Sequence, residues 1–167
     1  EALIHKGPDE YEIIKLPVPK ARVNTIVDSA TIIIQDDVID LKGIRKFRGY
    51  YANNLNHYLD GMTSQRDRKE FWGGYLEVGN NKSRLISYDP IIVSDSLYAV
   101  AYHIKVDDYI QKSNDEIYLN CNMHKIYQDR QPLKNERDID LKLRYKSEVD
   151  IDYYIQIPAN YEISYLP

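Results

Sequence analysis

The sequence is poor in the residues that define several specialised classes of protein. It has one cysteine, which excludes an intramolecular disulfide framework and a cysteine-rich zinc site. Seven glycines and seven prolines in 167 residues exclude a collagen-like or low-complexity chain. The longest uncharged apolar runs are short, as at residues 31–34 and 91–93. No stretch approaches the roughly 18–20 residues that span a bilayer, so we expect no membrane span.

The chain also lacks an excess of positive charge and a recognisable targeting segment. It carries 22 Lys and Arg against 26 Asp and Glu, for a net charge of -4. Dedicated nucleic-acid-binding domains are usually basic, so we expect no nucleic-acid partner. The chain starts at Glu1 rather than Met and shows no signal-peptide pattern. We therefore expect residues 1–167 to be one domain that is a piece of a longer protein.

The sequence is well supplied with apolar residues and with tyrosine. It is 43% hydrophobic and 29% charged, which supplies enough apolar material for a core. Sixteen tyrosines accompany two phenylalanines and one tryptophan. Tyrosine suits the half-buried faces of sheets, and the short β-branched and aromatic runs are separated by turn-forming residues. This composition indicates a β-rich domain.

Nine segments have the composition of strands. They are residues 11–18, 30–35, 38–47, 83–88, 97–106, 116–122, 138–145, 149–157 and 161–166. The second and third flank Asp36-Asp37, which predicts a β-hairpin. The third alternates, with Ile39, Leu41 and Phe47 on one side and Asp40, Lys42 and Lys46 on the other. These lengths predict a mainly β fold, an antiparallel β-sandwich with a short helical insertion at about residues 50–78.

The helical insertion is predicted because apolar residues here recur every three or four positions instead of every second position. One helical face is formed by Tyr51, Leu55, Tyr58, Leu59 and Met62, with Asn53, Asn54, Asn56 and His57 opposite. Gly61 is a plausible stop for this helix. Ser64, followed three residues later by Asp67, predicts the start of a second helix that runs through Leu76.

The last two long strands can be paired by the register of their apolar faces. A loop at residues 146–148 sets Leu143 opposite Ile151 and brings both apolar faces to the same side. The same register places opposite charges in cross-strand pairs, Arg144 with Asp150 and Lys142 with Asp152.

Cysteine and histidine offer few candidates for catalysis or metal binding. Cys121 and His124 are three residues apart, but the thiol has no helix start beside it to lower its pKa. A Cys-x-x-His pair also supplies only two metal ligands. We therefore expect Cys121 to pack as a small side chain in a strand. The four histidines are scattered, and we expect them to be solvated: His5, His57, His103 and His124.

The charged clusters have structural and functional interpretations. Acidic residues gather at Asp36-Asp37, Asp107-Asp108 and Asp150/Asp152, and we expect turns and solvated strand faces there, because no calcium-loop spacing is present. Basic residues gather in two groups, Lys42, Arg45, Lys46 and Arg48, then Arg66, Arg68 and Lys69. A basic strand edge that discourages aggregation is one interpretation, and binding of an anionic polymer is the other. Gly73-Gly74 does not form a phosphate loop. We expect no catalytic, cofactor-binding or metal-ligating residue in this chain.

The end of the chain resembles a known domain family. The pattern begins at Arg130-Gln131-Pro132-Leu133 and ends at Ile155-Gln156-Ile157-Pro158-Ala159-Asn160-Tyr161-Glu162-Ile163-Ser164-Tyr165-Leu166-Pro167. It is similar to the ending of an uncharacterised domain that follows a transglutaminase-like domain in multidomain bacterial envelope proteins. The upstream residues Phe47-Arg48-Gly49 and Arg66 are compatible with that family.

The resemblance implies a non-catalytic accessory domain whose partner is the neighbouring transglutaminase-like domain of the same chain. It implies a periplasmic or cell-surface location. The catalytic Cys, His and Asp of such enzymes belong to the preceding domain, and Cys121 does not match their motif. The ligand stays open between a polysaccharide and a protein. The alternative function is a carbohydrate-binding module that uses surface tyrosines, since an aromatic face with a hydroxyl suits sugars.

The predicted terminal hairpin can be tested by substitution. We expect Leu143→Asp to unfold the domain, because it buries an unpaired carboxylate. We expect Asp152→Ala to lower the free energy of unfolding by less than about 1 kcal/mol, because exposed ion pairs are weak. Urea denaturation of both variants checks this, and a folded, stable Leu143→Asp protein would contradict the register.

Overall fold

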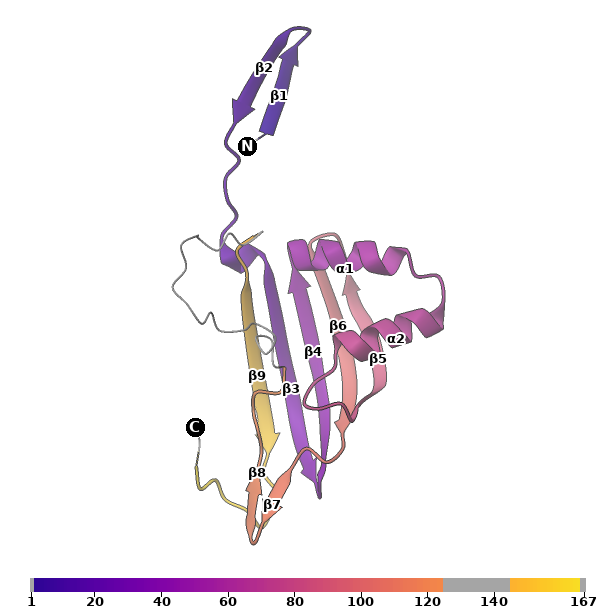
Figure 1. The fold of residues 1–167 in the computed structure, drawn as a ribbon, viewed down its shortest axis with the longest axis vertical. Coiled ribbons are helices and arrows are strands. Elements are labelled where there is room, and N and C mark those ends of the chain that lie inside the picture. The colour runs from indigo at the N-terminus through magenta and orange to yellow at the C-terminus, as the bar shows by residue number, and fades with distance from the viewer. Residues whose placement is uncertain (1, 125–144, 166–167) are drawn as a thin grey trace, which may run out of the picture.

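A five-stranded sheet forms the body of the protein, and two helices lie against one of its faces (Figure 1). The computed structural model describes residues 2–124 and 145–165. The elements in chain order are β1 (Ala2–Gly7), β2 (Glu10–Ile14), a 3-10 turn (Ala21–Val23), β3 (Thr25–Gln35), β4 (Val38–Arg48), α1 (Tyr50–Asp60), α2 (Gln65–Tyr75), β5 (Ser83–Val93), β6 (Leu97–Val106), β7 (Gln111–Ser113), β8 (Glu116–Tyr118) and β9 (Glu148–Gln156). The mainly β fold with a helical insertion is confirmed.

The large sheet has the strand order β5-β6-β4-β3-β9. Strands β3 and β4 form the predicted hairpin around Asp36-Asp37, with Gln35 paired to Val38. Asp36 has a φ of 56°, a left-handed conformation that Asp tolerates better than most residues. Strand β6 has the predicted bounds, and its even-numbered residues from Tyr98 to Val106 are buried as the alternation predicts.

Several predicted strands differ from the structure. Strand β9 pairs in parallel with β3, so the sheet is mixed rather than wholly antiparallel. Pairing between strands so far apart in sequence leaves no local signal. Residues 161–165 form no strand, and the strand predicted over 116–122 ends at Tyr118. The other arm of the terminal hairpin, residues 138–144, lies outside the described residues.

The first strands also differ from the prediction. A separate hairpin of β1 and β2 occupies residues 2–14, where one strand over 11–18 was expected. Strand β5 continues past the predicted end at Tyr88 to Val93. It runs through Pro90, which is tolerated because β5 is an edge strand with two register shifts in its pairing to β6.

The helical insertion has the predicted bounds and the predicted cap. The Ser64 hydroxyl accepts hydrogen bonds from the backbone N–H groups of Arg66 and Asp67, which starts α2. Helix α1 is capped from a distance, because the side-chain oxygen of buried Asn24 accepts the N–H of Tyr50 at 3.0 Å. A side chain on Gly49, whose φ is 60°, would collide with that oxygen.

The buried face of α1 is narrower than the sequence predicts. Leu55 and Leu59 are buried as expected, and Ala52 is buried with them. Tyr58 is 65% exposed, so its placement on the buried face is wrong. An 11-residue helix that contacts a twisted sheet buries only a narrow stripe, and Tyr58 lies just outside it.

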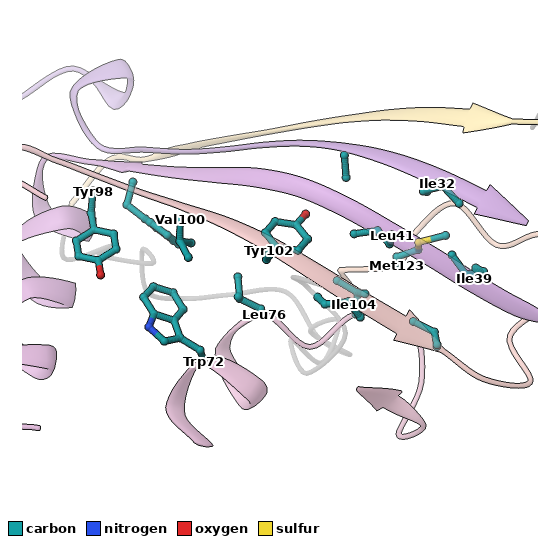
Figure 2. Packing of buried hydrophobic residues seen from close by; sticks show 14 of the residues in the cluster. Ile32, Ile39, Leu41, Trp72, Leu76, Tyr98, Val100, Tyr102, Ile104 and Met123 are labelled. Carbon is teal, nitrogen blue, oxygen red and sulfur yellow. The ribbon is translucent and has the colours of Figure 1, made fainter. Parts of the chain in front are cut away.

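The hydrophobic core lies between the helices and one face of the sheet (Figure 2). Trp72 of α2 is fully buried, and its ring lies 5.7 Å from that of Tyr98 on β6. Met123, which follows β8, reaches the same core near Leu41 (Figure 2). Neither helix of the described chain has the length and apolar character needed to cross a membrane.

The helix–sheet packing gives a matched pair of substitutions. Leu55→Ala should lower the free energy of unfolding by about 2–5 kcal/mol, because it leaves a cavity beneath α1. Tyr58→Ala, on the exposed side of the same helix, should change it by about 0.5 kcal/mol or less. Urea titration monitored by the fluorescence of Trp72 measures both. Equal losses in the two variants would contradict this assignment of the helix faces.

Candidate functional site

A buried ion pair lies on the core face of the sheet. Asp28 of β3 and Arg45 of β4 are direct cross-strand neighbours, and both side chains point into the core. Their side chains are only 1% and 8% exposed. The Asp28 Oδ2 atom accepts a hydrogen bond from Arg45 Nε at 2.9 Å and lies 2.9 Å from Arg45 Nη2. Because the contact joins a guanidinium and a carboxylate, it is stronger than a hydrogen bond between neutral groups.

Tyr102 of β6 joins the pair from across β4. Its hydroxyl donates to Asp28 Oδ1 at 2.7 Å. The ring passes over Gly43, the cross-strand neighbour of Tyr102. A Cβ atom on Gly43 would lie 2.6 Å from the Tyr102 hydroxyl oxygen, so this strand position requires glycine. Both oxygens of Asp28 therefore have donors.

His124 completes the cluster from the segment that follows β8. Its Nε2 lies 2.8 Å from Asp28 Oδ2, and its Nδ1 lies 3.0 Å from Arg45 Nη2. In a neutral imidazole, Nε2–H then donates to Asp28 and Nδ1 accepts from Arg45. Arg45 Nη1 donates to the backbone carbonyl of Tyr75 at 3.0 Å, where α2 ends. The cluster thus connects three strands, a helix end and a loop.

The electrostatics of the cluster favour the ionised carboxylate. Burial raises the pKa of Asp28, but the hydrogen bond from His124 and the positive charge of Arg45 together lower that pKa below its ordinary value. Burial beside the same carboxylate raises the pKa of Tyr102 far above its ordinary value. Burial likewise raises the pKa of Tyr153, whose ring stacks on His124 with centroids 5.9 Å apart.

The cluster has the residue types of a catalytic site without its geometry. An Asp–His pair orients a base in many hydrolases, where the second imidazole nitrogen faces a nucleophile. Here the second nitrogen of His124 faces the guanidinium of Arg45. The Tyr153 hydroxyl is buried with no hydrogen-bond partner among the described residues. We conclude that the cluster fixes the positions of elements in the core.

Three predicted placements are corrected by this cluster. His124 is buried and hydrogen-bonded rather than solvated. Arg45 does not belong with the exposed basic residues of its strand, and β4 is central in the sheet, so the strand-edge interpretation is wrong. Cys121 lies three residues beyond β8 and is exposed, rather than packed in a strand. The thiol therefore lies outside the cluster that His124 joins.

The remaining histidines and acidic residues have ordinary structural roles. His103 lies 2.8 Å from Asp40 on the other face of the sheet, so it is paired rather than solvated. His5 and His57 are exposed as expected. Asp107 and Asp108 form ion pairs with Arg84 and Lys82, while Asp150 and Asp152 are exposed on β9. In the described part of the chain, no group of three or more His, Cys, Asp or Glu side chains is placed to hold a metal ion.

The second basic group divides between two roles. Arg68 donates to the carbonyls of Met62 and Leu59 at 3.0 and 3.2 Å, which satisfies the end of α1. Arg66 and Lys69 line a shallow hollow between α2 and β5, beside Glu70. The carboxylate reduces the positive charge there.

The exposed tyrosines are spread along the chain, with two of them on α1. They are Tyr11, Tyr50, Tyr58, Tyr75, Tyr118, Tyr154, Tyr161 and Tyr165. Tyr154 alone among them borders a hollow of about 660 Å³ on the outer face of the sheet, the face opposite the helices. Lys42, Lys46 and three serine and threonine side chains also line this hollow. Comparison with known proteins gave no match to a family model, a curated protein or a solved structure.

Sequence reasoning missed the buried cluster although one signal for it was present. Arg45 has the same odd numbering as Leu41 and Phe47, which predicts the core face. A charged side chain on an apolar face requires a partner of opposite charge, and an acidic residue on the neighbouring strand can provide it. Asp28 lies just outside the strand predicted to begin at Ala30, so the pair was not recognised.

The cluster predicts a pH-dependent loss of stability. Asp28→Asn should lower the free energy of unfolding by about 3–5 kcal/mol at pH 7, because it leaves Arg45 buried without its counter-charge. A depressed pKa means that ionised Asp28 stabilises the fold above its ordinary pKa of 3.8 and that this contribution is lost as pH falls through the folded value. The difference between wild type and variant should therefore shrink below about pH 4.

Denaturant melts of both proteins from pH 7 to pH 2 measure this difference. Asp107→Asn is the matched control, because its partner Arg84 is exposed, and little change in stability is expected at any pH. A constant difference between wild type and Asp28→Asn across the whole range would contradict the ionised cluster.

Proposed function

We propose that this chain is a non-catalytic β-rich accessory domain of an exported protein and that it packs against a neighbouring transglutaminase-like domain. The observation that carries the proposal is the hairpin of β1 and β2, which stands clear of the sheet and helices (Figure 1). The similarity of the chain's end to domains that follow transglutaminase-like domains supports the choice of partner. We propose a periplasmic or cell-surface location on the same similarity.

One face of the hairpin is apolar and uncovered. The register pairs Leu3 with Ile13 and His5 with Tyr11, so these four side chains share a face. Leu3 is 66% exposed, Ile13 70% and Tyr11 59%. The opposite face carries the ion pair of Lys6 with Glu12 together with the apolar side chains of Ile4 and Ile14. The face with Leu3, Ile13 and Tyr11 lacks this ion pair and exposes larger apolar side chains, so it is the face suited to contact with a protein surface.

An isolated two-stranded hairpin of this kind is only marginally stable in water. It becomes stable when a third strand or a helix covers its apolar face. The connection to β3 contains Pro17 and Pro19, which favour an extended backbone and keep the hairpin away from its own sheet. We therefore propose that the exposed face of the hairpin packs against a neighbouring domain.

The buried cluster supports a structural rather than a catalytic role. Asp28, Arg45 and His124 bind one another and the core, as described above. A second candidate function, a carbohydrate-binding module, is favoured by the hollow beside Tyr154 on the outer face. The two functions use different surfaces and are compatible.

Hydrogen exchange tests the docking of the hairpin. Backbone amides of β1 and β2 should exchange at least about tenfold more slowly in a longer polypeptide that includes the transglutaminase-like domain than in residues 1–167 alone, because docking stabilises the hairpin ladder. Mass spectrometry of peptides covering residues 2–14 measures the rates, and peptides from β6 provide the internal reference.

Variants identify the face that docks. Leu3→Asp combined with Ile13→Asp should restore fast exchange in the longer polypeptide. Lys6→Gln combined with Glu12→Gln, on the opposite face, should keep it slow. Identical exchange of the hairpin in the long and short polypeptides would contradict the proposal.

A further inference from the structure

The outer face of the sheet presents an ordered row of polar side chains. Following the pairing from β9 to β5, the register aligns one residue from each strand. The row is Tyr154, Thr31, Lys42, His103 and Ser87. All five line the hollow of about 660 Å³. At about 4.8 Å between strands, the row extends for about 19 Å across the sheet.

The neighbouring row has an apolar centre, with Asp152 of β9 and Asp89 of β5 at its two ends. Ile44 lies at its centre, flanked by Ser29 on β3 and Ala101 on β6. One step further along β4, Lys46 projects to the same side as Lys42, about 13 Å away at about 3.3 Å per residue. Along β4, the hollow therefore has the apolar side chain of Ile44 between two lysines.

Lys42 and Lys46 have no direct ion-pair partner within the described residues, although Asp89, Asp150 and Asp152 lie on the same sheet face. The neighbouring Lys105 and His103, by contrast, share Asp40. Asp89 is the one acidic side chain among the described residues that line the hollow. An anionic ligand with charges roughly 13 Å apart complements this pattern.

The exposed ring of Tyr154 narrows the ligand class further. It is 67% exposed at the end of the row, with the hydroxyl of Thr31 next to it. A flat aromatic ring beside hydroxyl donors suits the apolar face and hydroxyl groups of a sugar ring. The hollow is shallow and open, which suits a chain passing over the sheet rather than an enclosed small molecule.

We propose that the outer face of the sheet binds a linear polysaccharide that carries carboxylate groups. Tyr154 packs against a sugar ring, and Lys42 and Lys46 bind carboxylates on separate residues of the chain. This proposal rests on the second candidate function and names its ligand. It involves β3, β4 and β9 rather than the hairpin, so it can fail while the docking proposal holds.

Affinity electrophoresis with defined polymers tests the proposal. Residues 1–167 should be retarded in native gels that contain polygalacturonate but not in gels that contain neutral dextran. Isothermal titration with oligogalacturonate then gives a dissociation constant. Tyr154→Ala and the double variant Lys42→Gln/Lys46→Gln should each weaken binding at least about tenfold, since each removes contacts worth about 1.4 kcal/mol or more.

Matched controls separate this site from general charge effects. Tyr58→Ala and the double variant Lys15→Gln/Lys112→Gln remove an exposed tyrosine and two exposed charges elsewhere, and both should bind like wild type. Absence of retardation by polygalacturonate would overturn the proposal. Equal retardation by dextran, or an equal loss of affinity in the control variants, would also overturn it. A third contrary result would be binding to double-stranded DNA that the Tyr154→Ala variant retains unchanged.

Discussion

The ion pair between Asp28 and Arg45 is the constraint on which the rest of the fold depends. Burying two charges is expensive, and their attraction roughly offsets that cost rather than adding much stability. The ion pair instead makes the pairing register of the two strands specific. A slip of one residue between β3 and β4 would turn Asp28 to the outer face and leave Arg45 buried without a partner. The pair therefore fixes the register of the central hairpin, and Tyr102 and His124 fix β6 and the segment after β8 to it.

Strand β4 shows how one segment can serve two surfaces. Its odd-numbered residues, Leu41 and Phe47 among them, build the core, and Gly43 leaves room for the ring of Tyr102. Its even-numbered residues from Lys42 to Lys46 form the floor and the charged groups of the outer hollow. Because alternation couples the two faces, the register that the buried ion pair selects also determines which side chains meet on the outside.

Local patterns predicted the parts of the fold that depend on local interactions. The turn at Asp36-Asp37, the alternation of β6 and the cap at Ser64 all follow from neighbouring residues. The parallel pairing of β9 with β3 could not be predicted, because it joins segments about 120 residues apart and leaves no periodic signal. The cluster around Asp28 was missed for a different reason. Arg45 was grouped with its neighbours by charge, although its strand position already placed it on the apolar face.

The separation of the two proposed surfaces follows from this architecture. The helices and the end of β8 cover one face of the sheet, so the elements of the core have little surface left for a ligand. The hairpin extends beyond the end of the sheet at which β3 begins (Figure 1). A contact made by Leu3 and Ile13 would therefore leave Tyr154 and Lys42 accessible. Taken together, the two proposals describe a domain that is fixed to its neighbour at one end and holds a polymer along its open sheet face beside that neighbour.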